Sequence, residues 1–331
     1  MTTTLEDASM IRRHTLGLAA AALLMSAVFP ASAQQVTLRA VNAFQEGTTY
    51  ARNFERFVEK VNQEGKGLVQ INYLGGPKAI PTMEQGAALR NGVVDLSNTT
   101  TSFIASVSPE SLSVNYASVP WAEMRRNGTV EFLNKLMMEK GLYYFARTGD
   151  GVPYHIYLNK RIDKADLSGL KIRIAPIYRE FFTRLGASVM QVAPGEVYTA
   201  LDRGVVDGYG WPLLGIFDLG WHEKTKYRVD PGFYNIELGV IFSAKSWNAL
   251  NAAQKAFLEK QGEWLESLNA DMSTKAAPAE TKRQADAGIE VIRLPEAEAK
   301  KFLQLSLDAG WAGVIATSPQ HGPKLRQLMA P

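Results

Sequence analysis

EQGAALRNGVVD at residues 84–95 and EVYTALDRGVVD at residues 196–207 are two copies of one pattern, with seven identical positions in the same register. Each copy reads as a helix that ends at a glycine, Gly92 or Gly204, and continues into a strand. Glycine suits this place because the residue after a helix often adopts a left-handed conformation. The pattern is either common helix-ending chemistry or a repeated corner. A repeated corner predicts two similar α/β lobes with a cleft between them, a preferred place for small-molecule sites.

The first thirty-three residues have the parts of a secretory signal peptide. A basic pair, Arg12 and Arg13, precedes an apolar stretch at residues 16–29 and a small-residue cleavage motif at residues 31–33. The apolar stretch is shorter than the ~20 residues that span a bilayer. We therefore expect cleavage and export, by the Sec or the twin-arginine route, with Met10 as an alternative start.

The overall composition excludes several classes of protein. The net charge of +3 is too small to indicate binding to nucleic acid or to an anionic membrane. The chain has no cysteine, which excludes disulfides, thiol catalysis and a lipid anchor on an N-terminal cysteine. The roughly 300 residues after the leader are enough for two domains, each with its own core.

Strands and helices alternate in both halves of the chain. The alternation predicts parallel pairing within each lobe, and in such sheets ligands bind beyond the carboxyl ends of the strands. The Thr-Thr-Thr-Ser run at residues 99–102 follows the strand of the first repeat, so it is a candidate for the cleft. The expected strands are residues 36–41, 69–74, 154–158 and 170–174, and the expected helices are residues 50–64 and 178–185.

The later part of the chain is predicted to connect the lobes. After a strand at residues 237–242, a helical region at residues 247–287 is long enough to span both lobes. A strand at residues 289–294 and a helical segment at residues 296–330 follow. No low-complexity linker interrupts the chain, so we expect crossing strands to join the lobes and to act as a hinge.

Catalytic, metal and cofactor motifs are missing from the sequence. The three histidines beyond the leader have no metal-ligand spacing, and no phosphate-binding loop or esterase elbow occurs. We therefore expect no metal and no cofactor. An exported hydrolase or isomerase remains the alternative, because acids near element ends could meet across the cleft, although such acids more often serve as helix caps. These acids are Glu46, Glu84, Glu196 and Asp207.

Arg173 is the leading candidate for a ligand anchor. It lies near the carboxyl end of the expected strand at residues 170–174, where apolar residues alternate with it. From there a planar guanidinium can form two parallel charge-assisted bonds with a carboxylate. The alternative is a solvated arginine at the edge of the sheet.

Aromatic residues gather at the same expected rim. Each of them taken singly is more often part of a core than of a site. Tyr209 and Trp211 flank a glycine and precede Pro212, which is typical of a turn and makes a core position less expected for them. The rim residues are Phe44, Tyr154, Tyr178, Tyr209, Trp211 and Phe233.

The mature sequence resembles the DctP-type solute-binding proteins of tripartite ATP-independent periplasmic (TRAP) transporters. The resemblance rests on DLSGLKIR at residues 166–173, GEVYTAL at 195–201, GVVDG at 204–208 and SAKSW at 243–247. It implies a two-lobed α/β fold of the periplasmic-binding-protein kind, with a ligand cleft between the lobes and a long bridging helix. It also implies a periplasmic receptor that closes on an organic acid and delivers it to the small and large membrane subunits of a permease, without catalysis.

The resemblance also implies roles for particular residues. Arg173 matches the arginine that bridges the ligand carboxylate, Asn42 matches an asparagine in the first strand-to-helix turn, and Thr100 matches a polar residue after the strand of the first repeat. Two departures matter: a second arginine is missing near residue 152, and Trp211 replaces a ligand-bonding asparagine. These changes favour a monocarboxylate with an aromatic or branched body over a dicarboxylate or a sugar acid.

The expected organisation follows from these points. The signal peptide is residues 1–33, lobe I is residues 34–150 with 237–276, and lobe II is residues 151–236 with 277–331. The ligand-binding candidates are Arg173, Trp211, Tyr209, Tyr154, Thr100, Asn42, Phe44 and Phe233. We expect a monomer, and a sensor subunit that presents ligand to a receptor is a further alternative to transport.

Overall fold

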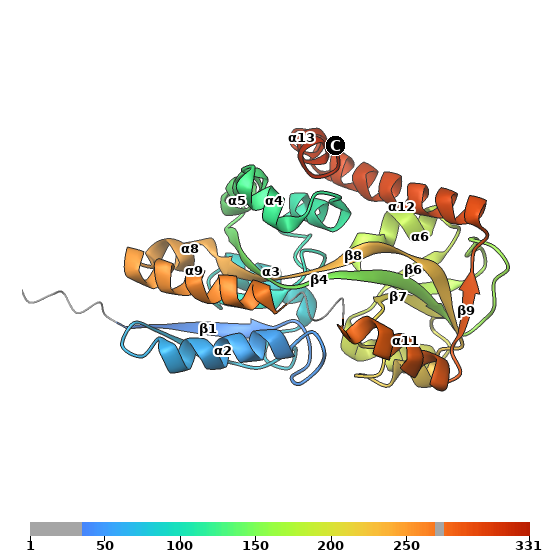
Figure 1. Cartoon of the computed structure of the whole chain (residues 1–331), viewed down its shortest axis with the longest axis horizontal. Coiled ribbons are helices and arrows are strands. Elements are labelled where there is room, and N and C mark those ends of the chain that lie inside the picture. Colours follow the sequence, from blue (N-terminus) through green and yellow to red (C-terminus); the bar gives the residue numbers. More distant parts are fainter. Residues whose placement is uncertain (1–34, 269–274) are drawn as a thin grey trace, which may run out of the picture. The chain divides into compact units, whose positions relative to one another are not determined.

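The computed structural model describes residues 35–268 and 275–331, so the expected signal peptide lies outside the described residues. Residues 36–331 form one compact unit. A mixed sheet runs through it in the order β2-β1-β3-β8-β4-β7-β5-β6, with β9 paired to β8 (Figure 1). The strands are β1 Val36–Asn42, β2 Val69–Tyr73, β3 Leu96–Thr99, β4 Leu142–Leu158, β5 Lys171–Ile174, β6 Ser188–Gln191, β7 Gly208–Pro212, β8 Tyr227–Ser243 and β9 Glu290–Arg293.

The two ends of this sheet have the same topology. On one side β1 pairs in parallel with β2 and β3, and on the other β5 pairs in parallel with β6 and β7. We call β1, β2 and β3 with their helices the first half, and β5, β6 and β7 with theirs the second half. The predicted parallel pairing within each lobe is confirmed. Both halves attach to the same antiparallel pair, β4 and β8, whose strands have 17 residues each.

The repeated sequence forms the same corner twice. Helix α3 (Gln85–Arg90) and helix α7 (Val197–Asp202) each end just before a left-handed glycine, with φ of 69° at Gly92 and 65° at Gly204. The backbone N–H of Val93 donates to Ala88 at 2.8 Å, and the N–H of Val205 makes the equivalent bond to Ala200 at 2.9 Å. The prediction of a repeated helix-to-strand corner is confirmed.

The aspartate at the end of each copy fastens its corner to the neighbouring strand. Oδ2 of Asp95 accepts the backbone N–H of Arg39 in β1 at 2.7 Å. Oδ2 of Asp207 accepts the backbone N–H of Lys171 in β5 at 3.0 Å. Each carboxylate also pairs with a cation, Arg39 or Lys160. Both aspartates therefore hold the scaffold together, and the expectation that Asp207 could reach the cleft is wrong.

The two halves are joined by the long strands β4 and β8, without a linker. The pairing of these strands shifts register repeatedly between Tyr144 and Ile156. On β8, Tyr234 has a φ of 25°, a conformation that side chains other than glycine seldom adopt. Irregular pairing bends strands and increases their twist. We therefore expect movement between the halves to occur here.

The helical region expected at residues 247–287 is not one helix. Helix α8 (Ala244–Ala249) stops because Leu250 is extended, with ψ of 137°, and Asn251 caps a separate helix, α9 (Ala252–Ser267). The cap is reciprocal: Asn251 Oδ1 accepts the N–H of Gln254 at 2.9 Å, and Gln254 Oε1 accepts that of Asn251 at 3.0 Å. Helix α11 (Ala277–Asp286) begins beyond residues 269–274, which lie outside the described residues.

Helix α12 (Glu296–Thr317) contacts both halves and crosses the upper part of Figure 1. Its Phe302 packs on Phe181 of the second half with ring centroids 5.0 Å apart. Its Trp311 packs on Tyr116, at the end of the 3-10 helix η2 (Pro109–Tyr116), at 5.9 Å. The other α-helices of the described residues are α2 Arg52–Glu64, α4 Trp121–Arg126, α5 Thr129–Glu139, α6 Arg179–Arg184 and α13 Gly322–Met329.

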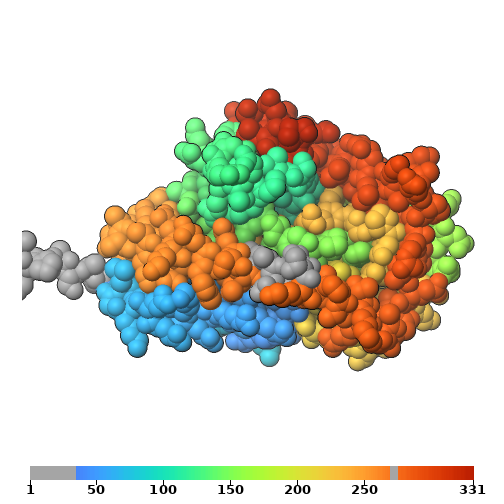
Figure 2. Space-filling model, viewed as in Figure 1, coloured from blue at the N-terminus to red at the C-terminus, as the bar shows by residue number. Residues whose placement is uncertain are grey.

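Helix α2 shows how the first half forms its core. As its spacing predicts, Phe54, Phe57, Val58 and Val61 lie on one face and are buried. They pack with β1 and with α9, and Figure 2 shows the orange α8 and α9 against the blue region of β1 and α2.

The segment Gly208–Pro212 is a strand, β7, so the prediction of a turn at Tyr209 and Trp211 is wrong. Its glycines serve packing instead. A Cβ on Gly208 would lie 2.3 Å from the carbonyl oxygen of Tyr157, and a Cβ on Gly210 would lie 2.9 Å from the Tyr178 ring. Neighbouring atoms therefore occupy the space that side chains at these two positions would need.

Candidate ligand-binding cleft

A pocket lies between the two halves, beyond the carboxyl ends of β1, β3, β5 and β7. Its cavity volume is about 10 Å³, room for about one water molecule, so a ligand fits only when the two halves move apart. Its position agrees with the rule for open α/β sheets. The lining residues are Phe44, Tyr50, Thr100, Ser102 and Phe103 from the first half, Ala175, Tyr178, Trp211 and Pro212 from the second, and Tyr154, Ile236 and Leu238 from the shared strands β4 and β8.

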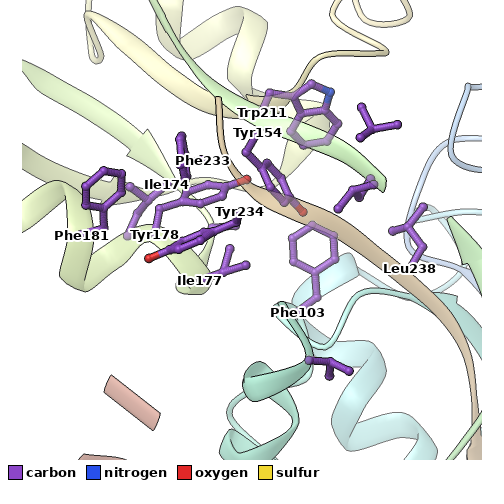
Figure 3. Close-up of a cluster of buried hydrophobic side chains, with 14 of the residues drawn as sticks. Phe103, Tyr154, Ile174, Ile177, Tyr178, Phe181, Trp211, Phe233, Tyr234 and Leu238 are labelled. Atoms are coloured by element: carbon purple, nitrogen blue, oxygen red, sulfur yellow. The ribbon is translucent and has the colours of Figure 1, made fainter. Parts of the chain in front are cut away.

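Six of the twelve lining residues are aromatic. The rings of Tyr154 and Tyr178 meet edge to face at 5.3 Å, and Trp211 meets Tyr50 of the first half in the same way at 5.9 Å. Figure 3 shows Trp211, Tyr154 and Phe103 grouped together, with Tyr178 to one side. The wall therefore favours a flat or branched apolar surface on the ligand.

Hydrogen bonds between the halves enclose the pocket. The Tyr50 hydroxyl donates to the carbonyl oxygen of Leu214 at 2.8 Å, and the N–H of Thr49 donates to Asp218 Oδ2 at 2.7 Å. The backbone N–H of Ile177 donates to Ser102 Oγ at 3.2 Å. These contacts describe a closed arrangement of the two halves.

Arg173 is completely buried in β5, between β6 and β7, so it is not a solvated arginine at the sheet edge. Its Nε donates to the carbonyl oxygen of Val192 at 2.8 Å, and its Nη1 donates to that of Gly210 at 3.3 Å. Its Nη2 has no hydrogen-bond partner in the described part of the chain. Burial lowers the pKa of Arg173, and the hydroxyl groups of Tyr178 and Tyr154 only partly offset this effect.

Trp211 lines the pocket and also contacts the arginine. Its ring lies 5.6 Å from the Arg173 guanidinium, within reach of a cation–π interaction. Its indole Nε1 is buried and has no partner among the described residues. Tyr209 lies on the same face of β7 but farther from the carboxyl end, where its hydroxyl bonds Thr225 at 2.7 Å, so it does not line the pocket.

Of the other predicted site residues, some line the pocket and the rest pack behind it. Phe44, Tyr154 and Thr100 line the pocket. Phe233 lies behind Tyr154, with ring centroids 6.1 Å apart. Asn42 is fully buried, and its Oδ1 accepts from the backbone N–H of Phe44 at 3.1 Å and from Asn98 Nδ2 at 3.0 Å, so it supports the turn instead of lining the pocket.

Sequence reasoning missed Tyr50, Phe103 and the buried acid Glu237. Tyr50 stands just before α2, close to the end of β1, and this position was the only sign of its role. Glu237 interrupts an apolar strand and is completely buried. An acid that breaks an apolar strand was the signal for a buried polar contact.

The groups that the enzyme alternative requires do not meet at this pocket. Glu46, Glu84 and Glu196 are exposed, and none of them lines the pocket. Among residues 35–268 and 275–331 no cluster of three or more metal-ligating side chains occurs. In the same residues, no helix is both long and apolar enough to cross a membrane.

An enclosed pocket between two α/β halves that share crossing strands defines a solute-binding protein of the two-lobed kind. Residues 40–309 match the DctP family model, described as bacterial extracellular solute-binding protein, family 7, and the chain belongs to this family. Membership makes it a solute-binding receptor of the DctP (TRAP) type and not an enzyme. Membership also implies partner subunits in the membrane.

Three relatives show how far the similarity extends. The monocarboxylate 2-oxoacid-binding periplasmic protein of Nostoc sp. is 25% identical over 265 residues, covering 73% of this chain and 72% of the relative. The C4-dicarboxylate-binding periplasmic protein DctP of Rhodobacter capsulatus is 24% identical over 263 residues, covering 76% and 78%. A TRAP solute-binding protein of Desulfovibrio salexigens with bound orotic acid superposes with a TM-score of 0.78 at 21% identity, covering 88% and 97%. This last likeness shows the two-lobed fold.

Proposed function

We propose that this receptor captures a small monocarboxylate with an aromatic or branched body through Arg173 and delivers it to the small and large membrane subunits of a TRAP permease. One observation carries the proposal: a fully buried guanidinium, with Nη2 unpartnered in the described residues, lies beside an aromatic pocket. Its hydrogen bonds go to carbonyl oxygens, which leave its charge uncompensated. A ligand carboxylate would supply the missing partner.

Opening of the halves is part of this proposal. Nη2 of Arg173 is buried in the closed arrangement, so a carboxylate must reach it while the halves are apart. The strands β4 and β8 provide the hinge. The ligand can shift the balance between open and closed forms only by its different affinity for the two.

The lining decides the proposed ligand class. It holds six aromatic residues and no cationic one, so a second carboxylate would enter the closed pocket without a counter-charge, at a considerable cost. Short aromatic or branched monocarboxylates, including hydroxy and keto acids, should therefore outcompete dicarboxylates and sugar acids. The name of the Nostoc relative supports this choice, whereas the Rhodobacter relative is named for C4-dicarboxylates, so similarity alone does not decide.

The remaining parts of the proposal concern the whole chain. We propose export through a signal peptide at residues 1–33, a monomeric receptor, and the lobe boundaries given above. Presentation of ligand to a signalling receptor is the second use of the same pocket, and neighbouring permease genes would favour transport.

A thermal-shift screen against organic acids tests the ligand class. At 100 times its dissociation constant, a ligand should stabilise the native protein by ~2.7 kcal/mol.

Intrinsic fluorescence of the wild type and of Trp211→Phe is then followed during titration with the best acid. Trp264→Phe is the matched control, because Trp264 lies on α9 beside Lys60 and not at the pocket. Loss of the signal in Trp211→Phe alone supports the proposal. A signal that does not depend on Trp211, with a preference for a dicarboxylate or sugar acid, contradicts it.

A further inference from the structure

A second charged side chain, besides Arg173, lies beside the pocket. Glu237 is 0% exposed and stands in β8 between Ile236 and Leu238, both of which line the pocket. Its Oε2 lies 3.3 Å from Oγ1 of Thr100, another lining residue. A single hydroxyl group therefore connects this acid to the space that a ligand would occupy.

The hydrogen bonds around Glu237 have a fixed direction. Oγ1 of Thr101 accepts from Asn115 Nδ2 at 2.8 Å, so its own proton is free to point to Glu237 at 2.7 Å. Oγ1 of Thr100 accepts the backbone N–H of Ser102 at 3.2 Å, so its proton points to Glu237 too. The N–H of Thr101 donates at 2.9 Å. Oε2 of Glu237 therefore accepts three hydrogen bonds from Thr100 and Thr101.

The charge of this carboxylate is only partly compensated. The Tyr144 hydroxyl donates a further hydrogen bond to it, but a hydroxyl carries no charge. Arg147 is the buried cation on this side, and it interacts with Glu237 as well as pairing with Asp150 at 2.9 Å, so its charge is divided between the two acids. Burial raises the pKa of Tyr154. Among nearby groups, Glu237 raises this pKa further and Arg173 lowers it, so Tyr154 interacts electrostatically with both side chains.

We infer that Glu237 is a specificity-determining residue: it excludes a second ligand carboxylate and favours a neutral N–H or O–H donor at the end of the ligand away from Arg173. The inference rests on the proposed function and names the ligand class more narrowly. Because the Thr100 proton is committed to Glu237, its hydroxyl can offer the pocket only a lone pair. A second carboxylate would face this lone pair and a like charge, whereas an amide or hydroxyl group could donate to it.

Calorimetric titration with three acids of one skeleton tests the inference: butanoate, succinate and succinamate, the monoamide of succinate. The wild type should bind succinamate at least about tenfold more tightly than succinate. Glu237→Gln should reduce this ratio by about tenfold, mainly through tighter binding of succinate. Glu110→Gln is the matched control, because Glu110 is also buried but lies in η2, outside the pocket lining, and it should leave the ratio unchanged.

The outcomes separate this inference from the proposed function. If succinamate binds the wild type better but Glu237→Gln leaves the ratio unchanged, the inference is overturned and the proposed function stands. If none of the three acids nor any other monocarboxylate binds, the proposed function itself fails. Should Glu237→Gln not fold, Thr100→Val removes the hydroxyl and keeps the carboxylate. Discrimination against succinate must then persist, and its loss would assign the specificity to Thr100 instead.

Discussion

The two repeated corners have the same backbone, but the strands that follow them carry different chemistry. After Asp95, β3 reads Leu-Ser-Asn-Thr and leads to the hydroxyl groups of Thr100 and Ser102. After Asp207, β7 reads Gly-Tyr-Gly-Trp-Pro and places Trp211 beside Arg173. The first half thus supplies hydroxyl groups and the second half supplies a cation, while both supply aromatic rings and the shared strand β8 supplies an acid. A duplicated corner fixes where the pocket lies, and the residues just beyond it decide what the pocket binds.

Removing the cation of the second half should have the largest effect. Arg173→Ala is expected to weaken binding of the cognate acid by ~2 to 5 kcal/mol, because one partner of a buried charge pair is lost. Arg173→Lys should also bind poorly, since an ammonium group cannot form the planar two-bond contact. Calorimetry gives the affinities. Arg184→Ala is the control, because Arg184 is a partly exposed arginine of the same half that pairs with Glu180. Binding by Arg173→Ala within threefold of the wild type would contradict the anchor.

The shared corner should matter for stability and equally in both halves. Asp95→Asn and Asp207→Asn are each expected to lower the free energy of unfolding by ~1 to 3 kcal/mol, because a backbone N–H and a cation lose a charged acceptor. Urea unfolding measures the change, and Asp163→Asn, at a side chain that is 97% exposed, is the control. A large decrease in the free energy of unfolding for one variant and none for the other would show that the two corners are not equivalent.

The two aspartates, Asp95 and Asp207, also predict that the free energy of unfolding depends on pH. Burial alone would raise the pKa of Asp95, but hydrogen bonds from the side chain and backbone of Arg39 outweigh it and hold the pKa below its usual range. Lys160 and the backbone of Lys171 do the same for Asp207. Because both folded-state pKa values are depressed, the stabilisation is fully present above the unfolded pKa of about 3.9 and is lost as the pH falls through the folded values. In each asparagine variant, the free energy of unfolding should therefore fall less steeply as the pH is lowered.

The scaffold could be predicted because its signals are local. A helix, a glycine and a strand in sequence define each corner. The alternation of apolar residues around Arg173 predicted its place near the end of β5. The site depended on distant partners. The hydrogen bonds of Glu237 come from residues up to 137 positions away, so the sequence around it shows only an acid in an apolar strand. Tyr209 and Trp211 look alike in the sequence, yet only their depth along β7 decides which one lines the pocket.

The smallest effect concerns how the two halves meet. Tyr50→Phe removes the hydroxyl that donates to the Leu214 carbonyl but keeps the ring that packs on Trp211. One neutral hydrogen bond contributes ~0.5 to 1.5 kcal/mol, so closure should weaken and ligand affinity should fall by roughly two- to tenfold. X-ray scattering should show a smaller radius of gyration with ligand than without it, and Tyr50→Phe should need more ligand for the same change.

Tyr198→Phe is the matched control for closure, because its hydroxyl donates to Glu223 within the second half and not between the halves. It should close at the wild-type ligand concentration. A scattering curve that saturating ligand leaves unchanged in the wild type would indicate a rigid cleft, and the two halves would then differ in chemistry without moving. If instead both tyrosine variants shift closure equally, the Tyr50 hydrogen bond adds nothing specific, and the ring contact with Trp211 and the other hydrogen bonds between the halves account for closure.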